Sequence, residues 1–134
     1  MSHTVTAIAE RFVERINAHD VDGLFALMSP DHRFIDSLGA TTQGEAQLRA
    51  AWESYFRMVP DYGLLIERTL ANGDEVVLLG IARGTYSPDG ALRAANAWET
   101  PVALRARVED GRVAEWRVYA DNEPIRTRMR GPSA

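Results

Sequence analysis

The feature that most constrains the fold is a change in hydrophobic period at Pro60. Before this proline, apolar residues recur every three to four positions in residues 4–18, 21–28 and 48–59, which is the spacing of helices with one buried face. After it, apolar and polar residues alternate in segments separated by turn sequences at 71–74, 87–90 and 109–112. Helices followed by a run of hairpins predict an α+β fold.

The strands are predicted from this alternation. We expect one short strand among the helices, at residues 32–39, and four after Pro60, at residues 62–70, 75–86, 91–108 and 113–120. Residues 1–124 are predicted to form one domain. Residues 125–134 show no apolar period and carry several arginines, so we expect a basic, flexible tail there.

One face of the strand at 75–86 carries three small residues in a row. Gly80, Ala82 and Gly84 alternate along it, and three small side chains in a row leave volume unfilled. A ligand or another backbone could occupy that volume. Alternatively, the third helix could fill it with its large aromatic side chains, and the sequence does not decide between these possibilities.

The strand at 32–39 carries the candidate chemistry. His32, Phe34 and Asp36 alternate, so they share one face of the strand, and an imidazole and a carboxylate flanking an aromatic ring suggest the wall of a pocket. Asp36 is predicted either as a general base or as a carboxylate that stabilises the following turn. His32 is a second catalytic candidate, with a satisfied core histidine as its alternative.

Composition excludes several other classes of site. There is no cysteine, and three histidines lie far apart in the sequence, so neither a thiolate site nor a histidine metal cluster is expected. The formal net charge of −4 argues against nucleic acid as the partner. No apolar run is long enough to span a bilayer, and no secretory signal is visible, so a cytoplasmic protein without cofactor is the expectation.

Four segments together resemble a known superfamily. Residues 12–24, 34–39, 109–113 and 116–121, in this order and spacing, are similar to SnoaL-like and ketosteroid isomerase-like proteins of the nuclear transport factor 2-like superfamily. The resemblance covers about residues 4–124. It implies a cone-shaped fold in which a curved antiparallel sheet wraps around three helices and encloses an apolar pocket.

The resemblance also implies roles for some residues. Asp36 falls where ketosteroid isomerases have their proton-shuttling aspartate, whereas Phe12 and Ala103 fall near the positions of their two oxyanion donors. Val118 stands where limonene epoxide hydrolases have an aspartate that activates water. The chain departs least from SnoaL-like cyclases, so we expect a small hydrophobic ligand and cofactor-free isomerisation or aldol-type cyclisation. The alternatives are a non-catalytic binding protein and a dimerisation module with a pocket filled by tryptophans.

Other side chains are candidates for contact with the ligand, and an outer sheet face is a candidate interface. The predicted ligand contacts are Phe12, Phe34, Trp52, Tyr55, Phe56, Asn96, Trp98, Trp116 and Val118. Arg117, Tyr119 and Asp121 alternate with the inward residues of the last strand, and the superfamily commonly pairs two subunits through that face, so a homodimer is expected. The simpler interpretation is a solvated face with charge pairs to Arg105 and Arg107.

Overall fold

The computed structural model describes residues 2–131, with side chains described from residue 5. The elements in chain order are α1 (Ser2–Asn17), α2 (Val21–Leu27), β1 (Met28–Ile35), β2 (Thr41–Gln43), α3 (Glu45–Met58), β3 (Gly63–Asn72), β4 (Glu75–Thr85), a 3-10 turn η1 (Ala94–Asn96), β5 (Ala97–Glu109), β6 (Arg112–Ala120) and α4 (Glu123–Arg130). None of the described helices is long and apolar enough to cross a bilayer.

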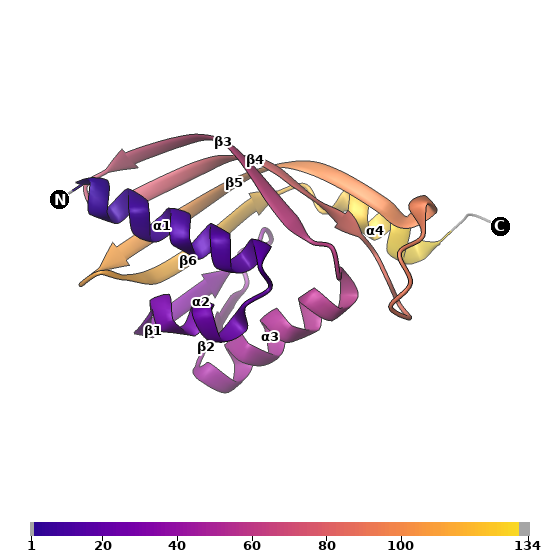
Figure 1. Ribbon diagram of the computed structural model, residues 1–134, viewed down its shortest axis with the longest axis horizontal. Helices are drawn as coiled ribbons and strands as arrows, with labels where there is room; N and C mark the ends of the chain where they lie inside the picture. The colour runs from indigo at the N-terminus through magenta and orange to yellow at the C-terminus, as the bar shows by residue number, and fades with distance from the viewer. Residues whose placement is uncertain (1, 132–134) are drawn as a thin grey trace.

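The six strands form a single curved sheet in the order β2-β1-β6-β5-β4-β3. Helices α1, α2 and α3 lie on one side of it, while α4 lies beyond one end of the sheet, near the C-terminus (Figure 1). All neighbouring strands are antiparallel except β1 and β6, which are parallel. The α+β fold with a curved sheet is therefore confirmed, and the parallel pair is the one departure from an all-antiparallel sheet.

The core lies between α1 and the concave face of the sheet. Ile8, Phe12 and Ile16 are spaced by four residues on α1 and are buried against inward residues of the strands. The ring of Phe12 lies 4.6 Å from that of Trp116 on β6, centroid to centroid. This packing fixes α1 over the centre of the sheet and leaves the space under α3 to be lined by other residues.

The small residues of β4 make room for protein atoms and not for a ligand. A Cβ atom on Gly80 would lie 1.9 Å from the carbonyl oxygen of Leu65, because β3 has an irregularity in register between Ile66 and Arg68. A Cβ atom on Gly84 would lie 2.3 Å from a methyl group of Val59, just after α3. The volume that the sequence leaves open is thus taken by the β3 backbone and by Val59.

The predicted tail, residues 125–134, begins inside α4, so residues 125–130 are helical. Ile125 is 8% exposed, and Nε of Arg128 donates to the carbonyl oxygen of Ala97 at 2.9 Å. A helix of eight residues with one buried side chain has no apolar period, so the sequence pattern could not reveal it. The end of the predicted tail, residues 132–134, lies outside the described residues.

The convex face of the sheet carries cross-strand charge pairs. The buried Glu115 forms ion pairs with Arg33 at 2.6 Å and with Arg105 at 3.1 Å, and Arg105 also pairs with Glu75 at 2.7 Å. Cross-strand charge pairs are therefore present, although their carboxylates come from glutamates and not from Asp121. The guanidinium of Arg117 lies over the ring of a neighbouring tyrosine, Tyr119.

Candidate functional site

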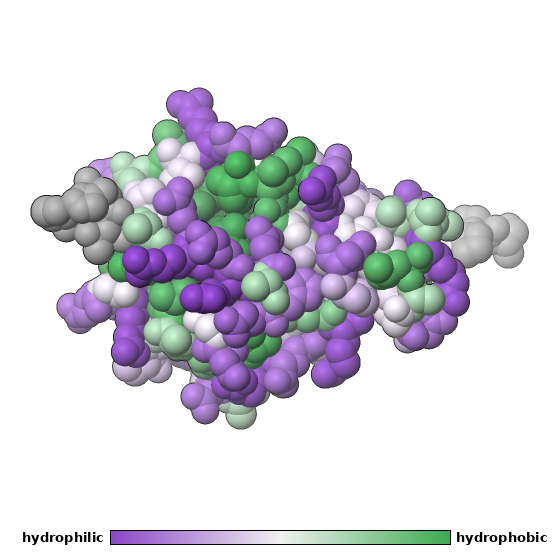
Figure 2. Space-filling view, viewed as in Figure 1, coloured by the Kyte–Doolittle hydropathy of each residue, from purple (hydrophilic) through white to green (hydrophobic). Residues whose placement is uncertain are grey.

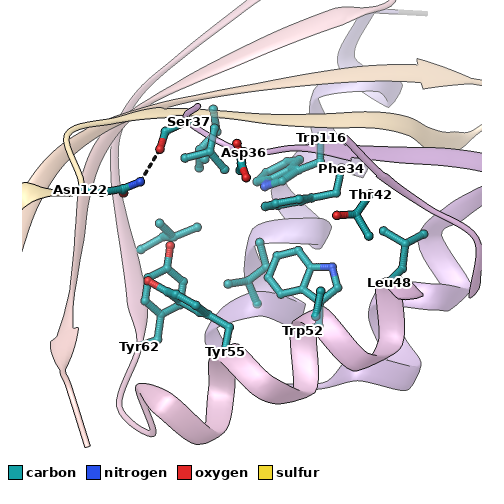
Figure 3. A pocket seen from close by; sticks show the side chains of 15 residues that line it. Phe34, Asp36, Ser37, Thr42, Leu48, Trp52, Tyr55, Tyr62, Trp116 and Asn122 are labelled. Atoms are coloured by element: carbon teal, nitrogen blue, oxygen red, sulfur yellow. Dashed lines mark hydrogen bonds between the residues drawn. The ribbon is translucent and has the colours of Figure 1, made fainter. Parts of the chain in front are cut away.

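A cavity of about 320 Å³ lies between α3 and the concave side of β1 and β6 (Figure 3). Its lining consists of Ile16, Phe34, Asp36, Ser37, Thr42, Leu48, Ala51, Trp52, Tyr55, Tyr62, Leu64, Leu104, Trp116, Val118 and Asn122. Most of these side chains are apolar or aromatic, and Asp36 is the only one among them that carries a formal charge. The cavity is therefore suited to a small, mainly apolar molecule.

The aromatic wall follows from the pairing of β1 with β6. Phe34 and Trp116 are partners in this parallel pair and point to the concave face. Trp52 approaches from α3, with its ring 5.5 Å from that of Phe34 in an edge-to-face arrangement. One helix and two strands thus supply three aromatic groups, which give the cavity a flat-sided apolar end.

Asp36 follows β1 directly, and its carboxylate stabilises the turn that connects β1 to β2. Its Oδ1 accepts from the amide of Leu38 at 2.9 Å and from the amide of Ala40 at 3.0 Å. Its Oδ2 accepts no hydrogen bond from the residues that the structure describes. The turn-forming role is therefore confirmed, and the same side chain also lines the cavity with one oxygen free.

Polar groups gather at the end of the cavity away from Phe34 and Trp52. The hydroxyl groups of Tyr55 and Tyr62 lie on one side of this end, and Ser37 and Asn122 lie on the other, joined by a hydrogen bond (Figure 3). Burial raises the pKa of both tyrosine hydroxyls well above their usual range, so both remain protonated at neutral pH. Each can donate a hydrogen bond to a polar atom of a ligand.

His32 does not join Asp36 at the cavity. It is 2% exposed, its ring stacks 5.9 Å from that of Phe12, and its Nδ1 donates to the carbonyl oxygen of Val113 at 2.6 Å. Burial lowers the pKa of His32, so the ring is neutral at neutral pH. Along the concave face of β1, His32 packs in the hydrophobic core, whereas Phe34 lines the cavity.

The predicted contacts divide between the cavity and its surroundings. Those that line it are Phe34, Trp52, Tyr55, Trp116 and Val118. Phe12 lies beneath Trp116, and Phe56 faces away and stacks on His19 with centroids 4.1 Å apart. Asn96 and Trp98 do not share a strand face at the cavity, because β5 begins only at Ala97 and Asn96 lies in the preceding turn.

Four polar residues of the cavity are not among the predicted ligand contacts: Ser37, Thr42, Tyr62 and Asn122. Ser37 and Asn122 lie in separate loops that meet only because β1 pairs with β6. Tyr62 lies just before β3, and its backbone is held by Nε2 of His19, which donates to the Tyr62 carbonyl oxygen at 2.8 Å. Alternation within the predicted strand 32–39 assigns Ser37 to the face opposite Asp36, and β2, which carries Thr42, is too short for a pattern. Tyr62 alternates with Leu64, which also lines the cavity, so that spacing could have indicated it.

Neither Phe12 nor Ala103, at the two positions where ketosteroid isomerases have oxyanion donors, presents a hydrogen-bond donor to the cavity. Phe12 is fully buried in the core, and Ala103 pairs with Tyr119 on the convex face of the sheet. Among the described residues, no three His, Cys, Asp or Glu side chains come together as metal ligands. The hydroxyl and amide groups that line the cavity are the remaining candidate donors for a substrate oxygen, and most of them lie at its polar end.

Several solved structures share this fold. A protein from Jannaschia sp. CCS1, provisionally described as a SnoaL-like polyketide cyclase, superposes with a TM-score of 0.85 at 20% identity, over 98% of this chain and 95% of the other. A ketosteroid isomerase-like protein from Catenulispora acidiphila gives 0.78 at 17% identity, over 93% of each chain. IdmH from Streptomyces antibioticus, provisionally described as a polyketide cyclase, gives 0.77 at 21% identity, over 93% and 97%.

The sequence itself identifies the family. No protein with curated annotation matches the chain. The profile of the SnoaL-like domain matches residues 9–116, which run from the middle of α1 to the end of β5 and beyond. That span covers most of the 134 residues and extends into β6 as far as Trp116. The chain therefore belongs to the family of SnoaL-like domains.

Proposed function

We propose that this chain binds a small hydrophobic carbonyl compound under α3 and that Asp36 acts on it as a general base without a cofactor. The observation that carries the proposal is the free Oδ2 of Asp36 in a cavity with aromatic walls. Because Oδ1 is held by two backbone amides, the carboxylate keeps a fixed position relative to a bound molecule. A positioned base of this kind is what proton abstraction next to a carbonyl requires.

The reaction balances with no further reactant. Asp36 takes a proton from the carbon next to the carbonyl, and the electron pair of that C–H bond becomes the enolate. In an isomerisation, the protonated Asp36 returns the proton to a different carbon of the same conjugated system. In an aldol-type cyclisation, the enolate carbon bonds to a second carbonyl carbon, and the proton ends on the new hydroxyl group.

The surroundings of Asp36 support this chemistry. Trp116 and Phe34 exclude water from one side of the ligand, which strengthens the electrostatic interactions of the site. Tyr55 and Tyr62 present neutral hydroxyl groups, which can hold a polar substituent of the ligand. The Jannaschia and Streptomyces proteins with this fold are provisionally described as polyketide cyclases, which is consistent with a carbonyl substrate.

The test is binding and turnover of a panel of cyclic ketones and diketones by the wild type and by Asp36→Asn. Asparagine keeps the shape of the side chain and can still accept from the two amides of the turn. We expect quenching of Trp52 and Trp116 fluorescence by ligand in both proteins, but turnover reduced by about 10²- to 10⁴-fold in the variant. Equal turnover by the variant would remove Asp36 as the base.

A second candidate is a binding protein without catalytic activity. It is favoured by the role of Asp36 in the turn, because that role alone would account for a carboxylate at this position. In this case ligands bind equally well to the wild type and to Asp36→Asn, and none is converted. A pure dimerisation module is less well supported, since the tryptophans do not fill the space beside Asp36.

We also propose that two copies pair through the convex face of the sheet. Leu65 and Leu70 on β3 and Tyr119 on β6 are 47%, 44% and 45% exposed. In Figure 2 hydrophobic residues gather over the strands labelled β3 and β4 in Figure 1. Light scattering should give a dimer for the wild type and a monomer for Leu65→Lys, whereas a monomeric wild type would contradict the pairing.

We further propose a cytoplasmic location for this protein. The sequence contains no cysteine, so its stability does not depend on an oxidising compartment. Fractionation of cells that produce the chain at its natural level should recover it with cytoplasmic marker enzymes. Recovery with a secreted or membrane fraction would contradict this part of the proposal.

A further inference from the structure

Ser37 and Asn122 form a polar pair beside the proposed base. Ser37 is the next residue after Asp36, and Asn122 lies between β6 and α4. Both line the cavity, and Nδ2 of Asn122 donates a hydrogen bond to Oγ of Ser37 (Figure 3). The two residues are 85 positions apart in the chain, so this contact depends on the folded structure.

The turn that contains Ser37 is held in a defined shape. Asp36 accepts from the amides of Leu38 and Ala40 through Oδ1, its own amide donates to the carbonyl oxygen of Ala40 at 3.0 Å, and the amide of Gly39 donates to the Asp36 carbonyl oxygen at 2.9 Å. Gly39 has a φ of 87°, a left-handed conformation that glycine adopts without strain. Ser37 therefore has a fixed position relative to the Asp36 carboxylate.

The hydrogen bond from Asn122 sets the orientation of the Ser37 hydroxyl. A hydroxyl group has one proton to donate and two lone pairs to accept with. Since Oγ of Ser37 accepts from Asn122, its proton points elsewhere, and Oγ donates no hydrogen bond to the described residues. The proton is thus available to a molecule in the cavity.

The Asn122 side chain hydrogen-bonds to Ser37 and does not cap α4, the helix that follows it. It is the N-cap residue of α4, where asparagine usually accepts from an amide of the first turn, yet its side chain makes no capping hydrogen bond. Pro124 has no amide proton, and the amide of Glu123 donates to Asp121 at 2.9 Å. The side chain is left free to reach Ser37.

We propose that Ser37 donates to the carbonyl oxygen of the substrate as it becomes an enolate, and that Asn122 is the positioning residue that aims this hydroxyl. This inference rests on the proposed function. It supplies an oxyanion donor from a loop, because Phe12 and Ala103 cannot donate from the usual positions. The proton stays on Oγ of Ser37 throughout, while Asp36 carries the proton that is removed from carbon.

The test uses two small aromatic probes and an Asp36→Asn background, which removes the negative charge beside the ligand. 4-Nitrophenol binds as phenol or phenolate, and absorbance distinguishes the two forms. 4-Nitroanisole has the same aromatic ring with a methyl ether in place of the hydroxyl group, so it cannot ionise. We expect Ser37→Ala to weaken phenolate binding by about ten- to a hundredfold, as for loss of a hydrogen bond to a charged group, and to leave 4-nitroanisole binding unchanged.

Further variants separate donation from folding. Ser37→Thr keeps a hydroxyl group and should restore most of the phenolate affinity. Asn122→Ser retains a capping residue for α4 but is too short to reach Ser37, so phenolate binding should fall severalfold. Combined with Ser37→Ala it should cause no additional loss, because Asn122 acts through Ser37. Ser54→Ala, which removes a hydroxyl group outside this cavity, is the matched control.

Three results would overturn the inference. Phenolate affinity that is unchanged in Ser37→Ala would place the oxyanion elsewhere, for example at the tyrosines. Equal loss of both probes would mean that the pair only shapes the cavity. An Asp36→Asn parent that binds neither probe would remove the proposed binding function and this inference with it, whereas the first two results leave that function intact.

Discussion

Substitution of Asn17 by alanine should destabilise the start of β3, which forms one wall of the cavity. Asn17 is the last residue of α1, and β3 is an edge strand of the sheet. The Asn17 side chain donates to the carbonyl oxygen of Leu64 at 3.1 Å and accepts from its amide at 2.7 Å. One side chain thus satisfies both backbone groups of Leu64 where no further strand is present.

The magnitude follows from these two hydrogen bonds. Each contributes about 0.5–1.5 kcal/mol net, and a backbone group left buried without a partner would raise the loss. Asn17 is exposed, however, so water can replace part of the interaction after substitution. We therefore expect the free energy of unfolding to fall by about 1–2 kcal/mol, which corresponds to a decrease in Tm of about 4–7 °C for 134 residues.

Urea denaturation followed by tryptophan fluorescence measures this change. Asn17→Asp keeps the acceptor for the Leu64 amide but loses the donor, so its stability should lie below that of the wild type as well. Glu14→Ala, an exposed change on the same helix, should remain within about 0.5 kcal/mol of the wild type. If Asn17→Ala were as stable as Glu14→Ala, the side-chain bridge to β3 would contribute nothing.

Three further predictions concern the sheet, the core and the C-terminal helix. Gly80→Ala should lower the free energy of unfolding by about 1–3 kcal/mol, because the added carbon collides with the Leu65 carbonyl oxygen; an unchanged urea midpoint would contradict this. Burial holds the pKa of His32 below its usual 6.5, so the unfolded chain binds a proton first as the pH falls. Stability should therefore decrease below about pH 6.5, by at most about 1.4 kcal/mol per pH unit from this group, and His32→Gln should remove that part of the slope in pH-dependent urea titrations. Ile125→Asp should release α4 and accelerate tryptic cleavage after Arg126 and Arg128, whereas an unchanged cleavage rate would show that Ile125 does not hold the helix.

The main helices and strands could be predicted because each is long enough to show an apolar period within its own sequence. α1 and α3 each place several apolar residues on one face, and Asn72-Gly73 marks the hairpin between β3 and β4. The elements that were missed are short. β2 has only three residues, and α4 has a single buried side chain, so neither shows a periodic pattern. Their positions depend on pairing and packing with distant segments.

The candidate site could be predicted only where it follows strand alternation. Phe34, Asp36 and Trp116 line the cavity because side chains two places apart share a face and because β1 pairs with β6. The same rule placed His32 beside them, but it could not show that the face passes from cavity to core along β1. Asn122 could not be found at all, since only the pairing of distant strands brings it to this site.

Hydrogen–deuterium exchange at carbon tests the role of Asp36 most directly. Ketones that bind in the cavity are incubated with the protein in D₂O, and NMR follows loss of the proton next to the carbonyl. This readout detects proton abstraction whatever the final product is. The proposed chemistry predicts exchange that is catalysed by the wild type and slowed by about 10²- to 10⁴-fold in Asp36→Asn, with ligand binding retained. Bound ketones that exchange no faster with the wild type than with the variant would contradict it.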